Sequence, residues 1–156
     1  VYISPAGTAN PATITDPWAA AWLLVGLLDG DEGFSDSRSV DTSDQFAWGG
    51  ILVRSSRKNF KLTRRFTALE DNATTRSLVW PGSTATSLVI PVPGQVKIGF
   101  ELREGTKKRR AITANYATVD VDGDIKENET DITKYPLVAT IFPTGAGELF
   151  KLQVSA

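Results

Sequence analysis

The chain has 156 residues, of which 41% are apolar and 22% are charged, and its formal net charge is -1. These values are typical of a single globular domain, and they argue against a disordered or fibrous chain and against the strongly basic composition of a general nucleic-acid binder. The sequence contains no histidine and no cysteine, which excludes a Ser-His-Asp triad, a thiol nucleophile, disulfide bonds and a zinc site built from histidine or thiolate.

The first part of the chain predicts an arm followed by a short buried strand. Residues 1–16 are rich in Pro, Ala, Thr and Gly, and only the first three residues favour an extended strand, so we expect an N-terminal arm or edge strand. Asp16 and Pro17 are typical of a helix start and predict one helical turn. The apolar run Leu23–Leu28 ends at a turn dipeptide and predicts a buried strand. The longest apolar stretch, Trp18–Leu28, has eleven residues and is too short to span a membrane.

Residues 29–45 are predicted to form a long loop. Between residues 29 and 44 the sequence carries six acidic residues and one arginine, and its only apolar side chains of size are Phe34 and Val40. A structureless loop of this length is uncommon inside a compact domain and is usually functional or ordered by a partner.

Strand patterns dominate the rest of the chain. We expect strands at Phe46–Arg54 and Phe60–Ala68, then a short helix capped by Asn72 and ended by Pro81 and Gly82. Alternating apolar residues predict further strands, and the glycines at 145 and 147 predict a hairpin between the last two. These strands are Val96–Arg103, Lys107–Val119, Leu137–Phe142 and Leu149–Val154. The fold class predicted is mainly β: an antiparallel sandwich or small barrel with one short flanking α-helix, in one domain of residues 1–156.

Three candidate chemical sites have ordinary alternatives. Residues 118–129 resemble a calcium loop in spacing, but they begin with Thr118 and have strand-like flanks, which favours an acidic turn. Glu127 and Glu129 could act as paired carboxylates, although nothing singles them out. The four tryptophans could form a sugar-stacking platform, but each lies in or beside an apolar segment, which favours packing in the core or at a subunit interface.

Charge is segregated into blocks along the chain. Residues 54–65 carry six cations and no acid, and residues 107–110 are four cations in a row. Residues 29–44 and 120–131 each carry six acids and one base. Complementary blocks suit contacts between copies of one chain, while a merely solvated surface is the alternative.

The order of several segments resembles the major tail tube proteins of long-tailed, siphovirus-type bacteriophages, in particular those of phages that infect actinobacteria. The resemblance is carried by V-Y-I-S-P-A-G-T at residues 1–8, V-G-L-L-D-G-D-E-G at 25–33, F-A-W-G-G-I-L-V-R at 46–54 and F-T-A-L-E-D-N at 66–72. It implies a β-sandwich with one flanking helix, assembled into hexameric rings that stack into a hollow tube for genome ejection, with no enzymatic activity and no cofactor or metal.

The resemblance also implies roles for particular residues. In the family, an N-terminal arm and a long loop reach adjacent subunits or rings, and these correspond to residues 1–16 and 29–45 here. The residues expected in inter-subunit or inter-ring contacts are Asp29, Asp31, Glu32, Phe34, Asp36, Asp41, Asp44, Arg54, Lys61 and Arg65. Those expected in the fold core or family motif are Trp48, Gly49, Gly50, Phe66 and Glu70.

The partners implied are further copies of the chain, a tape measure protein, and tail terminator and baseplate proteins. Viral DNA would pass through the lumen without sequence-specific binding, no membrane would be involved, and the tube would be assembled in the bacterial cytoplasm and reside in the virion tail. A cationic lumen would bind phosphates, so we expect Lys61 and Arg65 to point away from it or to pair with a neighbour's acidic loop, and residues 120–129 to lie near a tube surface or ring junction.

Two other interpretations remain open from the sequence. A monomeric carbohydrate- or surface-binding β-sandwich would explain the strands equally well, but not the acidic segment or the segregated charge. The inner tube of a contractile injection device would share every feature named above, because a sheath is encoded by other genes.

Overall fold

The structure, a computed structural model, describes residues 1–84 and 86–155. In these residues every strand pair is antiparallel, and nine strands and one short helix are present, which confirms the predicted mainly β fold class. Nine strands and the helix follow in the order β1 Tyr2–Pro5, β2 Leu23–Leu24, β3 Ser35–Ala47, β4 Ile51–Ala68, α1 Ala73–Val79, β5 Val96–Glu104, β6 Lys107–Thr113, β7 Ala117–Val121, β8 Tyr135–Ile141 and β9 Phe150–Val154.

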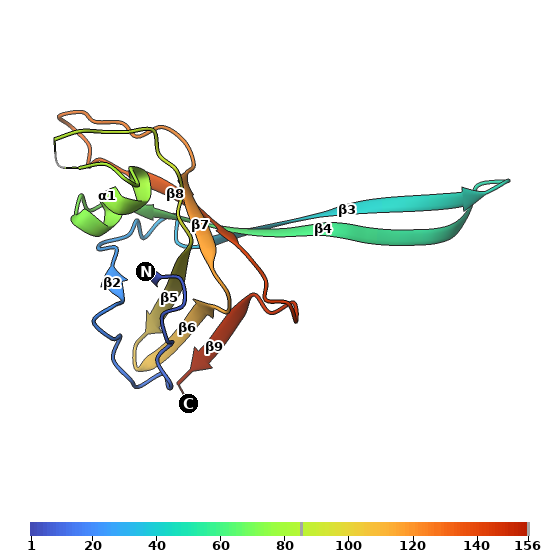
Figure 1. Cartoon of the computed structure of the whole chain (residues 1–156), viewed down its shortest axis with the longest axis horizontal. Coiled ribbons are helices and arrows are strands. Elements are labelled where there is room, and N and C mark those ends of the chain that lie inside the picture. Colours follow the sequence, from blue (N-terminus) through green and yellow to red (C-terminus); the bar gives the residue numbers. More distant parts are fainter. Residues whose placement is uncertain (85, 156) are drawn as a thin grey trace.

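The strands form two layers that share a single connecting pair. One layer has the order β3-β4-β8-β7 and the other has the order β2-β1-β5-β6-β9. The layers are linked where Val96 of β5 pairs with Ala117 of β7. The helix lies at the end of the sandwich away from the tip of the β3–β4 hairpin (Figure 1).

Aromatic rings fill the space between the layers. Phe66 of β4 and Phe100 of β5 are 2% and 1% exposed, and their ring centroids lie 5.9 Å apart in an edge-to-face arrangement. Phe150 of β9 meets the same Phe100 ring. The alternation that predicted Val96–Arg103 and Phe60–Ala68 as strands therefore identifies the two strands that meet across the core.

Residues 25–27 and 70–75 form a junction that fixes the helix. Asn72 accepts a hydrogen bond from the Thr75 N–H at 2.9 Å as N-cap, and its amide donates to the Val25 carbonyl at 2.8 Å. Glu70 accepts from the Leu27 N–H at 3.0 Å. Gly26 adopts a φ of +106°, and a Cβ there would come within 2.3 Å of the Glu70 carboxylate, so only glycine fits this approach. The helix predicted from Asn72 is confirmed.

The longest ladder is the β3–β4 hairpin, and it corrects two predictions. Residues 35–44 are strand, although they were predicted as part of the loop 29–45, and Phe46–Arg54 is not one strand because it turns at residues 48–50. Residues 35–47 form a strand through backbone pairing with β4. Every position of this strand is exposed, so its sequence shows no alternation of apolar and polar residues that would predict a strand.

Four smaller predictions are also wrong. Residues 16–19 are not helical, and the strand predicted at Lys107–Val119 is two strands, β6 and β7, separated by residues 114–116. The run Leu23–Leu28 contributes only the two-residue strand β2, whose side chains are about half exposed. The glycines at 145 and 147 do not join a paired hairpin, because β8 pairs with β4 and β7 while β9 pairs with β6 in the other layer.

Candidate functional site

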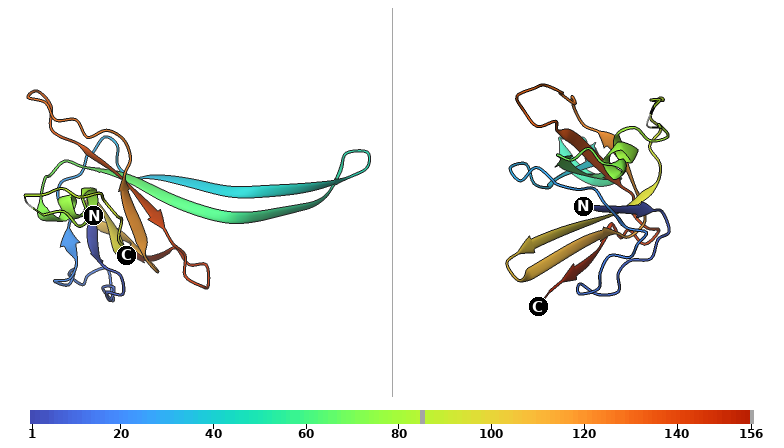
Figure 2. Two further views of the ribbon diagram at one scale, coloured as in Figure 1. Left: turned by 45° about the horizontal axis from the view of Figure 1, so that its top comes forward. Right: turned by 90° about the vertical axis from the view of Figure 1, so that its left-hand side faces the viewer.

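The β3–β4 hairpin projects far out of the sandwich along the long axis of the molecule (Figures 1 and 2). All of β3 and most of the distal half of β4 are exposed. A two-stranded ribbon in water is marginally stable alone, so this extension calls for a partner.

The root of the hairpin is held by one arginine. Arg64 donates two hydrogen bonds to the Asp36 carboxylate, at 2.6 and 2.7 Å, across the two strands. Its guanidinium also lies 4.8 Å from the ring centroids of Phe100 and Phe150. Hydrogen bonds from Arg64 lower the pKa of Asp36 below its usual value, against the opposing effect of burial. The pair therefore joins the hairpin to the aromatic core.

A bulge marks the point where the hairpin leaves the body. The register shifts between Ser39 and Asp41, and opposite it Asn59 has a φ of 55° and donates to the Asp41 carboxylate at 2.8 Å. Bulges bend and twist a ladder, and the hairpin curves along its length (Figure 2).

The hairpin tip is apolar and exposed. Gly49 and Gly50 have φ values of 95° and 80°, which glycine adopts without strain, and the Gly50 N–H donates to the Ala47 carbonyl. The apolar side chains around this turn have exposed fractions from 53% to 103%, and they are Phe46, Trp48, Ile51, Leu52 and Val53. The prediction that Trp48, Gly49 and Gly50 belong to the fold core is wrong, because they lie at this tip.

The two strands of the hairpin carry opposite charges. β3 contributes Asp36, Asp41 and Asp44, whereas the outer part of β4 carries Arg54, Arg57, Lys58 and Lys61. Of the residues predicted for inter-subunit contact, Asp44, Arg54 and Lys61 are exposed on the hairpin.

Other residues predicted for such contacts are bonded within the chain. Asp29 is 7% exposed and accepts from the Lys134 ammonium and the Asp31 N–H, and the hydrogen bond from Lys134 lowers its pKa. Glu32 accepts from the Thr67 hydroxyl. Phe34 packs edge-on against the buried Phe100 ring. The structure places this stretch of the predicted loop against the body, while Asp31 remains exposed.

The outer face of β3-β4-β8-β7 is a polar surface with a shallow hollow of about 380 Å³. Arg65 pairs with Asp122 of the same chain there. The residues around the hollow are mostly hydroxyls and paired charges: Ser37, Ser39, Lys61, Thr63, Arg65, Asp120, Asp122, Val138 and Thr140.

The opposite outer face, on β1-β5-β6, is covered by a strap, residues 6–22. Arg110 and Glu101 form a buried ion pair at 2.7 Å, with both side chains 4% exposed. The Arg110 guanidinium lies over the Trp18 ring and donates to the carbonyls of Thr13 and Asp16, while the Trp18 indole donates to Glu101. Sequence reasoning missed this pair, because both residues occupy positions that alternate with core residues and look solvent-facing.

A second hollow, of about 940 Å³, lies beside α1. Trp80, Leu88, Ile125 and Tyr135 line it from separate segments. Arg76 at its edge donates two hydrogen bonds to the Asp71 carboxylate, which lower the pKa of Asp71. The neighbouring segment carries further exposed apolar side chains at Val89, Ile90 and Val92.

The candidate chemical sites of the sequence do not come together. Within residues 1–84 and 86–155, no three acidic side chains gather in a way that could hold a metal ion. The tryptophans do not share one face: Trp18 and Trp22 contact each other in the strap, Trp48 lies at the hairpin tip and Trp80 ends the helix. Across the described part of the chain, no helix has the length and apolar character needed to cross a bilayer.

Comparison with known proteins identifies a family for this chain. A family model described as phage tail tube protein matches residues 1–153, nearly the whole chain. The search of curated proteins gave no match.

Proposed function

Because the chain belongs to the phage tail tube protein family, and is therefore a structural protein of the phage tail, we propose that it forms hexameric rings. These rings stack into the tube of a long-tailed bacteriophage, and the tube conducts the genome into the host. Membership of the family establishes a structural tail tube protein; the hexameric ring, its stacking and the passage of DNA are proposed in addition.

The projecting hairpin is the observation that carries this proposal. Its tip exposes five large apolar side chains, with Trp48 103% exposed, and such a patch on a monomer marks an interaction site. A contact between a projection and a different surface of the next copy is heterologous, and heterologous contacts produce rings and repeating tubes. The hairpin therefore takes the reaching role first assigned to a loop at residues 29–45.

The N-terminal arm is a weaker candidate for reaching a neighbour. Lys97 donates to the Thr8 carbonyl and the Asn10 side chain, and Gln153 donates to the Pro11 carbonyl. Together with Arg110, these bonds tie the strap to its own sheet. We therefore propose that the hairpin, and not residues 6–16, makes the long-range contacts.

We assign the lumen to the outer face of β3-β4-β8-β7. The strap covers the other outer face, so this one is the free sheet surface that can line a barrel. Lys61 and Arg65 lie on it, contrary to expectation, but Asp120 and Asp122 share the face and balance their charge. A surface of hydroxyls and balanced charges gives DNA phosphates no dense positive field to bind.

Further copies of the chain are the first partners in this proposal. A tape measure protein inside the tube, and terminator and baseplate proteins at its ends, follow from the same role, as do assembly in the host cytoplasm and residence in the virion tail. DNA is a passing cargo, without sequence-specific contacts, and no catalytic step is assigned.

Negative-stain electron microscopy and sedimentation velocity test this function directly. We expect rings or hollow tubes that grow with protein concentration. A matched variant replaces residues 41–58 by an Asn-Gly turn, which removes the exposed distal hairpin and leaves the core strands. We expect it to keep the near-ultraviolet circular dichroism of the parent and to form no tubes. Strictly monomeric parent protein at every concentration and salt, or tubes from the shortened variant, would overturn the proposal.

A further inference from the structure

The hairpin tip needs a receiving surface with a particular chemistry. Its apolar side chains require an apolar hollow. The cations that follow on β4, Arg54, Arg57 and Lys58, outnumber the acids Asp41 and Asp44 on the facing strand, so acids near the hollow would complement them. The tip spans several side chains, so a cleft wider than one indole ring is needed.

The hollow beside α1 has these properties. It holds about 940 Å³, at the upper end of the volumes that binding pockets occupy. Trp80 and Leu88, which are 38% and 64% exposed, and the half-buried Ile125 and Tyr135 give it an apolar floor.

The rim of the hollow carries the complementary charge. Residues 124–131 contain four acids and one lysine, and Glu127 of this loop lines the hollow. Arg76, the one cation lining it in the part of the chain that the structure describes, is neutralised by two hydrogen bonds to Asp71. An approaching Arg54 or Arg57 therefore meets net negative charge.

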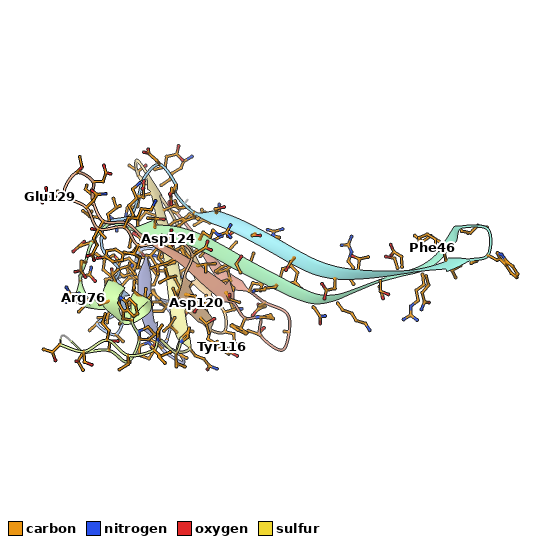
Figure 3. All side chains as sticks on the ribbon, turned by 90° about the horizontal axis from the view of Figure 1, so that it is seen from above. Phe46, Arg76, Tyr116, Asp120, Asp124 and Glu129 are labelled. Carbon is orange, nitrogen blue, oxygen red and sulfur yellow. The ribbon has the colours of Figure 1, made fainter. Side chains whose placement is uncertain are left out.

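The tip and the hollow lie at opposite ends of the molecule. In Figure 3, Phe46 marks the far end of the hairpin, while Arg76 and Glu129 lie at the other end of the long axis. The hairpin cannot fold back into its own hollow, because its strands lead away from it. Copies placed end to end bring one tip to the next hollow, and the same contact repeats along the axis.

We propose that the hairpin tip of one copy docks in the hollow beside α1 of a second copy, with Trp48 as its aromatic anchor. The inference rests on the proposed tube and adds the receiving surface. Trp80 and Tyr135 of the receiving copy contact the inserted apolar side chains, and its acidic loop 124–131 contacts the cations of β4. Aromatic anchors seated in desolvated clefts carry most of the energy of such interfaces.

Cysteine cross-linking tests the contact sharply, because the chain has no cysteine of its own. Ala47→Cys places one thiol at the tip and leaves Trp48 intact, and Ser77→Cys places one on the hollow-lining face of α1. Each single variant is mixed with the other under mild oxidation, in dilute and in concentrated protein. We expect disulfide-linked dimers from this mixture and linear ladders from the double variant.

The control pairs Ala47→Cys with Thr106→Cys, an exposed turn position away from the hollow. Tubes without cross-links between 47 and 77, or cross-links equally frequent at 106, would overturn the docking site and leave the proposed function standing. Cross-links without tubes would support the docking site and contradict the proposed tube. Absence of both rings and cross-links in concentrated protein would contradict both.

Trp48→Ala supplies a second measurement. The side chain is fully exposed in the monomer, so the melting temperature of dilute monomer should not change. We expect the critical concentration for assembly to rise at least tenfold. Phe60→Ala, an exposed aromatic change on the hairpin stem, serves as the matched control. A similar rise for both variants would contradict the role of Trp48 as anchor.

Discussion

The ring of Trp18 lies directly on Gly99, so that a Cβ atom on Gly99 would come 2.2 Å from the ring. Trp18 also stacks on Tyr2, at a centroid distance of 4.5 Å. The strap is thereby packed on the outer face of β5, and glycine is the residue that allows this approach.

Gly99→Ala is expected to displace Trp18 and loosen the strap. Overpacking of this kind costs about 1–3 kcal/mol, to be measured as a loss in the free energy of unfolding by urea denaturation. Gly145→Ala is the control, because a Cβ there meets nothing within 4 Å. Equal stability of the two variants would show that Trp18 does not occupy this position.

The buried pair of Glu101 and Arg110 predicts sensitivity to acid. Burial raises the pKa of Glu101, but hydrogen bonds from Arg110, Trp18 and Arg103 outweigh it and lower the pKa from 4.5 to about 2. A carboxyl with a lower pKa in the folded state stabilises the fold above pH 4.5, and this contribution is lost as pH falls from about 4.5 towards 2. We expect the melting temperature to fall through this window.

Glu101→Gln separates this effect from general acid denaturation. It leaves the buried Arg110 charge unpaired, which costs about 3–5 kcal/mol at neutral pH. The gap in melting temperature between parent and variant should narrow as pH falls below 4.5. Glu148→Gln, in the half-exposed pair with Lys151, is the control and should cost less than about 1 kcal/mol. A constant gap at all pH values would contradict the assignment.

The core strands could be predicted because their large apolar side chains alternate with other residues. Ile98 and Phe100 are buried in the core, while Lys97 and Glu101 occupy the alternate positions, so the sequence carries the period of the strand. The same rule does not reveal that Glu101 and Arg110 are buried, because the strap residues Trp18 and Thr13 that bond to them are 83 and 97 positions away. No local sequence pattern indicates that the strap buries these two residues.

The hairpin shows the opposite limitation. Asp36, Asp41 and Asp44 lie in a strand that has no buried face, so its sequence lacks alternation and resembles a loop. The resemblance placed Trp48, Gly49 and Gly50 in the fold core or family motif, and the tryptophans were expected in the core or at a subunit interface. These residues are exposed at the tip of the single chain, and in the proposed tube they contact another copy. Sequence patterns alone do not distinguish burial within a subunit from burial between subunits.

Asn72 is expected to stabilise the fold through two separate bonds. Asn72→Ala removes the cap on Thr75 and the donation to Val25, and should cost about 2 kcal/mol. Asn72→Asp keeps the capping oxygen and loses the donor, so it should cost less than the alanine change. Chemical denaturation of both variants measures the order, and a larger loss for aspartate would contradict this division of roles.

Arg64 and Arg65 are neighbours with different expected importance. Arg64 is 14% exposed, pairs with Asp36 and covers two aromatic rings, whereas the side chain of Arg65 is 56% exposed. Arg64→Lys loses the two-bond geometry and should destabilise the fold by about 1–2 kcal/mol. Arg65→Lys should cost less than about 1 kcal/mol. Thermal unfolding of the two variants compares them directly, and equal losses would refute the role of Arg64 at the hairpin root.

Charge balance on the proposed lumen face predicts a gain of DNA binding when it is broken. Asp120→Lys adds two positive units beside Lys61 and Arg65 in each subunit, and a ring repeats the change around the lumen. We expect tubes of this variant, assembled with short duplex DNA, to retain DNA at low salt and to release it as salt rises. Lysine side chains that bind phosphates release the condensed counterions of DNA, so this binding weakens at higher salt concentration. Parent tubes should retain little.

The matched control for this change is Glu104→Lys, which makes the same charge difference at the exposed turn between β5 and β6, outside both hollows. Co-sedimentation of labelled DNA with tubes measures retention for parent, Asp120→Lys and Glu104→Lys in parallel. We expect only the Asp120→Lys tubes to retain DNA, and we expect the tube wall to protect that DNA from added nuclease. Equal retention by both variants, or full nuclease sensitivity of the retained DNA, would place Asp120 on an outer surface and refute the assignment of this face to the lumen.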